Sequence, residues 1–192
     1  MFFLKKTTLI PCNNHVILKV VVEEIIMIAL QIQDIKNFMG KLLLSQTFDN
    51  FLLVEGSVTT YNTFRIEGRV HKDFFTPEEI DEKQLESREF SLWKEVKPFC
   101  LELIKGKKTP LGFKFTFQLS KENTAKLLTS SGITSIQPEN VSGLLLNVRY
   151  DSNGLQVITA TNLSLFTLDK TLEHAWDDMV KRFLKQQEIS FL

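Results

Sequence analysis

The sequence has few cysteines, no excess of charge of either sign and no familiar catalytic motif. Its two cysteines, Cys12 and Cys100, cannot build a disulfide framework, and neither stands in a CxxC or zinc-ligand spacing. Lysine plus arginine and aspartate plus glutamate both total 23, so no global field attracts nucleic acid or an acidic membrane. The GxSxG, P-loop, GxGxxG and HExxH motifs are absent. These absences disfavour secreted disulfide-rich proteins, strongly basic proteins and the common enzyme classes.

The opening stretch, residues 1–26, fits neither a secretory signal nor a membrane span. Pro11 breaks the first apolar run, and VILKVVVEEIIMIAL carries three charged side chains, which are costly inside a bilayer. Val22-Glu23-Glu24 can be encoded by a sequence that contains GGAGG, the usual bacterial ribosome-binding sequence, two codons before Met27. We therefore expect residues 1–26 to be a translated leader. The alternative is a β-prone extension in which VILKVVV forms a strand, and cytoplasm is the expected location.

From Met27 onward, the pattern predicts a single α+β domain with two similar halves, at about 27–75 and 112–168. In the first half, the strand IALQI precedes a helix over about 35–44, which Asp34 caps. FLLVEGSVTT and TFRIEGRV then form a hairpin. A hydrophobic content of 43% and 16 phenylalanines predict a core rich in aromatic packing.

The second half repeats this order. FKFTFQL alternates apolar and polar residues as a half-buried strand does, Ser120 caps a helix, and Gly132 ends it. GLLLNVRY, LQVITAT and LSLFTL are three further predicted strands. Each helix needs a sheet to cover its apolar side, so we expect a mainly antiparallel sheet built from two strand-helix-strand-strand halves.

Two helical segments lie outside the repeat. A central insert, 76–106, begins with the helix start Thr76-Pro77, continues through DEKQLESRE, which we expect to be exposed, and ends in a helix from about Ser91 to Lys105. A C-terminal helix over about 170–187 carries an apolar stripe at helical spacing.

Two resemblances follow from these segments. FKFTFQLSKENTAKLL and GLQVITATNLSLFTL are similar in topology to half of a DNA sliding clamp. MIALQIQDIKNFMGKLLL, FDNFLLVEGSVTTYNTF, KPFCLELIKGKKTP and TLDKTLEHAWDDMVKRFLKQQ resemble the recurring segments of an uncharacterised domain family of the Firmicutes, mainly of clostridial relatives. This second resemblance runs from Met27 almost to the end and implies no activity.

The candidate contact residues are lysines. The segment LIKGKKTP holds the densest basic patch, which could bind a phosphate or simply complement the dipole at a helix end. A clamp-like domain would also place the helices at 35–44 and 121–130 side by side, with their lysines toward a duplex. The candidate nucleic-acid or anion contacts are Lys36, Lys41, Lys105, Lys107, Lys108, Lys121 and Lys126.

No catalytic, cofactor or metal site is predicted. His174, Asp177 and Asp178 share one helical turn and could be part of a metal site, but we interpret them as a solvated polar face. His71 and Asp73 lack a nucleophile, and we interpret them as an exposed turn. The residues expected in the core from their apolar helix positions are Trp93, Cys100 and Trp176.

The first hypothesis for function is therefore a non-enzymatic cytoplasmic binding or interaction domain with a protein partner. The alternative is a clamp-like DNA-associated protein. A third hypothesis is an enzyme of unrecognised type that uses His71 or His174 as a base. Membrane association is not expected, and homo-oligomerisation stays open.

Overall fold

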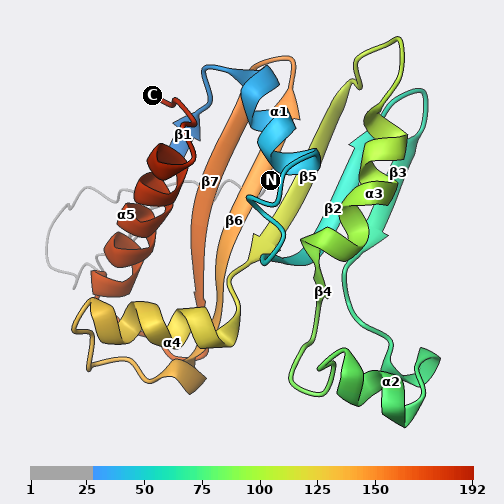
Figure 1. Ribbon diagram of the computed structural model, residues 1–192. Coiled ribbons are helices and arrows are strands. Elements are labelled where there is room, and N and C mark those ends of the chain that lie inside the picture. The colour runs from blue at the N-terminus through green and yellow to red at the C-terminus, as the bar shows by residue number, and fades with distance from the viewer. Residues whose placement is uncertain (1–27) are drawn as a thin grey trace, which may run out of the picture.

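The computed structural model describes residues 28–192, in which helices pack on one face of an antiparallel sheet (Figure 1). The predicted leader, residues 1–26, and the alternative strand VILKVVV lie outside the described residues. Among the helices of residues 28–192, none has the length and apolar character that a bilayer span needs.

Seven strands form the sheet in the order β1-β7-β6-β5-β2-β3, with β4 paired to β2, and every pairing is antiparallel. The strands are β1 (Ala29–Gln31), β2 (Leu52–Thr59), β3 (Thr63–Glu67), β4 (Ser91–Leu92), β5 (Gly112–Gln118), β6 (Val141–Asp151) and β7 (Gly154–Leu163). The predicted α+β class with a mainly antiparallel sheet is confirmed.

Five α-helices and two short 3₁₀ helices complete the described part of the chain. They are α1 (Ile35–Leu43), η1 (Lys72–Phe74), α2 (Pro77–Glu82), α3 (Trp93–Ile104), α4 (Lys121–Ser130), η2 (Pro138–Asn140) and the long C-terminal α5 (Thr171–Gln186). The predicted caps form: the Asp34 carboxylate accepts from the Asn37 amide at 2.9 Å, and the Ser120 hydroxyl accepts from the Asn123 amide at 3.3 Å. Gly132, just beyond α4, has a φ of +67°.

The two predicted halves interleave within the one sheet. The first half runs β1-α1-β2-β3 and the second runs β5-α4-β6-β7. Strands β7, β6 and β5 occupy the centre, whereas β1 lies at one edge and β2 and β3 lie toward the other. Beyond β1, Ile32 bridges to Phe191, so the C-terminal residues join the same edge. The strands of the first half are therefore divided between the two sides of the sheet, whereas those of the second half are neighbours.

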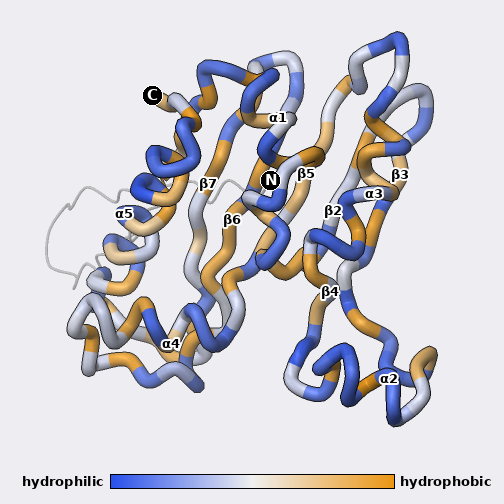
Figure 2. Tube along the Cα trace, viewed as in Figure 1, coloured by the Kyte–Doolittle hydropathy of each residue, from blue (hydrophilic) through white to orange (hydrophobic). Residues whose placement is uncertain are grey.

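The core lies between the sheet and the helices α1, α3, α4 and α5, which share one face of the sheet (Figure 1). Phe113, Phe115 and Phe117 alternate along β5 and are buried, as the sequence pattern predicted. The Trp93 ring centroid lies 5.0 Å from those of Phe115 and Phe117. Figure 2 shows hydrophobic residues along β5 and β6 and hydrophilic ones at the turn after α3.

One predicted strand is not a strand. The segment LSLFTL, residues 163–168, leaves the sheet after Leu163, and the side chain of Phe166 is 84% exposed. β1 pairs with Gln156–Ile158 of β7 and does not reach Leu163. The chain after Leu163 turns toward η2 instead, where the Ser164 amide donates to the Asn140 carbonyl at 2.9 Å.

The segment DEKQLESRE, residues 81–89, is not exposed throughout. Gln84 adopts a positive φ of 53°, the chain reverses, and the Leu85 amide donates to the Ile80 carbonyl at 2.9 Å. Leu85 is thereby buried to 1% exposure. The prediction also missed β4, a pairing of Ser91 and Leu92 with β2 that immediately precedes α3.

Candidate functional site: a lysine-rimmed groove

An open groove of about 650 Å³ lies between α1 and the end of α3. We call it the lysine groove. Its lining is mainly apolar and comes from both helices and from the strands beneath them. The apolar lining residues are Ile35, Met39, Leu43, Leu44, Leu101, Ile104, Pro110, Phe113 and Tyr150. Its size is that of a ligand-binding cleft, and its apolar lining favours a partner that buries apolar surface there.

Four of the seven predicted contact lysines meet at this groove. Lys36 comes from the first turn of α1, whereas Lys105, Lys107 and Lys108 follow the end of α3. Lys105 is ion-paired with Glu102. Within residues 28–192, no carboxylate lies within ion-pair distance of the other three lysines. The groove therefore combines an apolar floor with a positive rim.

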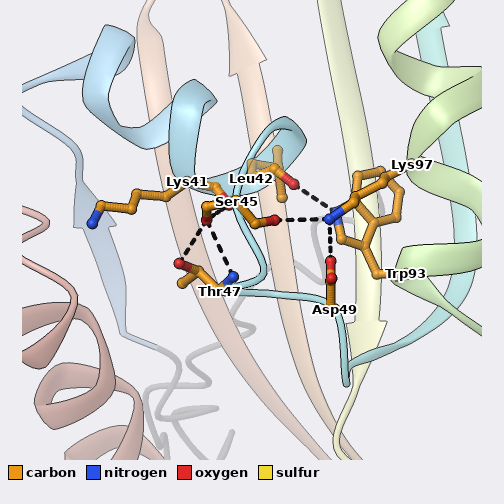
Figure 3. A network of polar contacts seen from close by, with 7 residues as sticks. All are labelled: Lys41, Leu42, Ser45, Thr47, Asp49, Trp93 and Lys97. Carbon is orange, nitrogen blue, oxygen red and sulfur yellow. Dashed lines mark hydrogen bonds and ion pairs between the residues drawn. The ribbon is translucent and has the colours of Figure 1, made fainter.

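Trp93 joins the two helices that contribute the walls of the groove. Its indole Nε1 donates to the Leu42 carbonyl at 2.7 Å, and the ring is fully buried (Figure 3). Leu42 lies in the last turn of α1, where carbonyls have no partner within the helix. The first residue of α3 thus satisfies the end of α1 and holds the two helices together.

A second polar contact joins α3 to the loop that follows α1. The Lys97 ammonium of α3 donates to the Ser45 carbonyl at 2.8 Å and forms an ion pair with Asp49 (Figure 3). The Lys97 and Asp49 side chains are each 16% exposed. The Ser45 hydroxyl in turn donates to the Lys41 carbonyl at 2.7 Å and accepts from the Thr47 amide at 3.1 Å. The loop after α1 is thereby tied to α3, so the groove walls are set by specific bonds.

Gly40 stands in the wall of the lysine groove, in the middle of α1. A Cβ atom added there would meet no atom within 4 Å. Glycine inside a helix costs about 1 kcal/mol relative to alanine. Nothing within residues 28–192 therefore requires glycine at this position, and its lack of a side chain leaves the α1 backbone open to the groove.

The remaining predicted lysines lie elsewhere. Lys41 is at the end of α1, beside a smaller depression that Lys36 also lines. Lys121 and Lys126 are in α4, and Lys126 is ion-paired with Glu122 at 2.6 Å. α1 packs against α3, whereas α4 packs against α5 and β6, and Figure 1 shows α1 and α4 at opposite ends of the sheet. The lysines of α1 and α4 do not form the single face that a clamp-like arrangement requires.

The histidine and carboxylate candidates do not converge. His71 and His174 are both exposed, one before η1 and the other on α5. Asp177, predicted to be solvated, is instead buried and accepts a hydrogen bond from Thr159. Burial raises the pKa of the Asp177 carboxyl above its usual value. Asp178, the next residue, is exposed, and no metal-binding cluster is found among the described residues.

The three residues predicted to lie in the core do so. Trp93, Cys100 and Trp176 are fully buried, and the Trp176 indole donates to the Leu145 carbonyl at 3.0 Å. Burial raises the pKa of the Cys100 thiol to about 12. The thiol is therefore protonated at neutral pH and is a poor nucleophile.

The described residues define an α+β domain with helices on one face of a single antiparallel sheet and a groove between two of those helices. The chain belongs to the family of unknown function DUF5721, whose model matches residues 41–192. The match begins at residue 41 rather than at Met27, so the strand IALQI and most of α1 lie before it. The searches of curated proteins and of solved structures found no match.

Proposed function

We propose that this chain is a non-enzymatic binding domain that recognises a partner protein through the lysine groove. The observation that carries the proposal is the junction of an apolar floor with three lysines that lack an acidic partner within residues 28–192. Apolar surface supplies most of the free energy of protein association, and unpaired charges at its rim select the partner. The bonds of Trp93 and Lys97, which join α3 to α1 and to the loop that follows it, favour a preformed site.

The proposal also concerns the setting of the protein. We place it in the cytoplasm of a bacterium, within the Firmicutes, on the resemblance of its segments and on the ribosome-binding-like codons before Met27. The free thiol of Cys100 in the core is in keeping with a reducing compartment.

The test compares proteins captured by the wild-type chain and by two charge-reversed variants. The groove variant carries Lys36→Glu, Lys107→Glu and Lys108→Glu. The control carries Lys121→Glu and Lys126→Glu, which are the same change on α4. A partner held in the lysine groove is lost from the first variant and kept by the second. Equal capture by all three chains, or turnover in an unbiased metabolite screen that survives further purification, would refute the proposal.

A clamp-like DNA-associated protein is the second candidate. It is supported by the repeated strand-helix-strand-strand order within one sheet, although the lysines of α1 and α4 are separated. Fluorescence anisotropy of labelled duplex and single-stranded DNA tests it. Binding through several lysines falls roughly tenfold or more between about 50 and 200 mM salt. It also weakens when Lys36, Lys41, Lys121 and Lys126 are neutralised together; no binding at low salt ends this candidate.

A further inference from the structure

We infer that the occupant of the lysine groove is an acidic amphipathic α-helix of a partner protein, seated with its backbone close to Gly40. The inference rests on the proposed function and names the chemistry of the partner. Three features support it: the open shape of the groove, the charge of its rim, and the glycine in its wall.

The shape of the groove favours a helix over a small molecule or a lipid chain. Sites for small ligands enclose most of the ligand surface. The lysine groove is open to solvent along the side away from the sheet, and Leu44 at its border is 72% exposed. A bound acyl chain would leave much of its length in water there. An amphipathic helix buries only one face in such a groove and keeps its polar face solvated.

The dimensions agree with this occupant. α1 lines the groove from Ile35 to Leu43, and its 9 residues give a wall about 14 Å long at 1.5 Å per residue. The other wall is the last turn of α3, from Leu101, together with the segment that follows it. A partner helix with about two and a half turns in contact matches the wall formed by α1. Its apolar residues, at i, i+3, i+4 and i+7, would contact Met39, Leu101 and Ile104.

The rim charges specify acidic flanks on that helix. Lys36 is at one wall, and Lys107 and Lys108 are at the other. Each lacks a carboxylate within ion-pair distance among residues 28–192, whereas Lys105 has Glu102. Glutamates or aspartates on both sides of the apolar stripe would pair with these ammonium groups. A basic partner helix would be repelled by the same rim.

Gly40 provides the point of closest approach. A Cβ at Gly40 would meet open space, and alanine would stabilise the helix. The packing of α1 therefore does not require glycine at this position. Glycine does allow a second backbone to come near, because no Cβ stands between them. Gly40 borders both the lysine groove and the smaller depression beside Lys41, and a Cβ there meets no atom within 4 Å. A longer side chain at this position therefore adds bulk at the border of the groove without disturbing the core.

The experiment is a display selection on the full chain with helical peptides of about 12–16 residues. Selected peptides are then measured against wild type, Gly40→Ala and Gly40→Gln. Both variants should fold at least as well as wild type, and Gly40→Ala should raise the thermal midpoint by about 2–4 °C. The selection should enrich acidic amphipathic sequences. Gly40→Gln should weaken their binding by about tenfold or more, as should the three-lysine groove variant, whereas the Lys121→Glu, Lys126→Glu control should not.

Two further probes are a DNA duplex and vesicles containing phosphatidylglycerol. They distinguish a wrong occupant of the groove from a groove that binds nothing. No enriched peptide, enriched peptides that are basic, or binding indifferent to Gly40→Gln overturns the inference. If DNA or vesicles bind instead and Gly40→Gln blocks them, the helix is the wrong occupant but the groove is still a binding site. If no probe binds and no captured protein depends on the groove, the proposed function fails as well.

Discussion

Replacement of Trp93 by phenylalanine tests whether the joint between α1 and α3 is as important as the geometry indicates. The substitution keeps one buried ring but removes the indole N–H, so the Leu42 carbonyl loses its donor in a fully buried site. An unsatisfied buried polar group costs about 1–3 kcal/mol. The smaller ring also gives up roughly 50 Å² of buried apolar surface, worth about 1 kcal/mol at ~25 cal/mol/Å². Trp93→Phe should therefore lower the free energy of unfolding by about 2–4 kcal/mol.

Urea unfolding followed by far-ultraviolet circular dichroism measures this loss. We expect a lower midpoint with an unchanged slope, because the fold and the surface exposed on unfolding stay the same. Trp176→Phe is the matched control, since Trp176 is equally buried and also donates to a backbone carbonyl, but on α5. Both variants should be destabilised, and only Trp93→Phe should also weaken binding at the lysine groove. A loss below about 1 kcal/mol for Trp93→Phe would show that the joint is dispensable.

Two further predictions concern buried titratable groups. The raised pKa of Asp177 means that its protonated form favours the folded state; this contribution is present below the ordinary value of 3.8 and is lost as pH rises through the folded-state pKa. The Asp177→Asn variant can still accept a hydrogen bond from Thr159. Its free energy of unfolding, measured with urea, should rise relative to that of wild type between about pH 4 and 7. If the difference in free energy between the two proteins is the same at both pH values, burial is not the cause. Cys100, in a Cys12→Ser chain, should resist iodoacetamide when folded and react once denatured, because burial holds its pKa at about 12. Mass spectrometry detects the adduct, and rapid labelling of the folded chain would contradict the burial.

Local signals in the sequence predicted most of the elements. Asp34, Ser120 and Gly132 stand at helix ends, and their side-chain or backbone chemistry acts over three or four residues. The alternating phenylalanines of β5 likewise show which side of one strand is buried. The strand predicted at residues 163–168 was wrong because the chain leaves the sheet where Ser164 bonds to Asn140, 24 positions away, and no local pattern contains that contact.

The lysine groove could be predicted only in part. The lysines of LIKGKKTP were identifiable as a dense basic patch, but their junction with Lys36 depends on how α1 packs against α3. That packing is set by the bond from Trp93 to Leu42, two residues 51 positions apart in the chain. Gly40 was missed, although a glycine inside a predicted amphipathic helix lowers the stability of that helix and was a second local sign of the groove.

The edge formed by β1 has a consequence for synthesis. Among the strands of residues 28–192, β1 pairs with β7 alone. On its other side the Gln31 amide donates to the Leu192 carbonyl at 3.0 Å, and the Leu192 amide donates to the Gln31 carbonyl at 2.9 Å. The first described strand therefore meets its neighbours only after nearly the whole chain has left the ribosome. During translation β1 lacks β7 until late, whereas α1 can already pack against α3 through Leu42 and Trp93. A nascent chain halted before residue 154 would already contain both walls of the groove, but it would lack the strand that anchors β1 to the sheet.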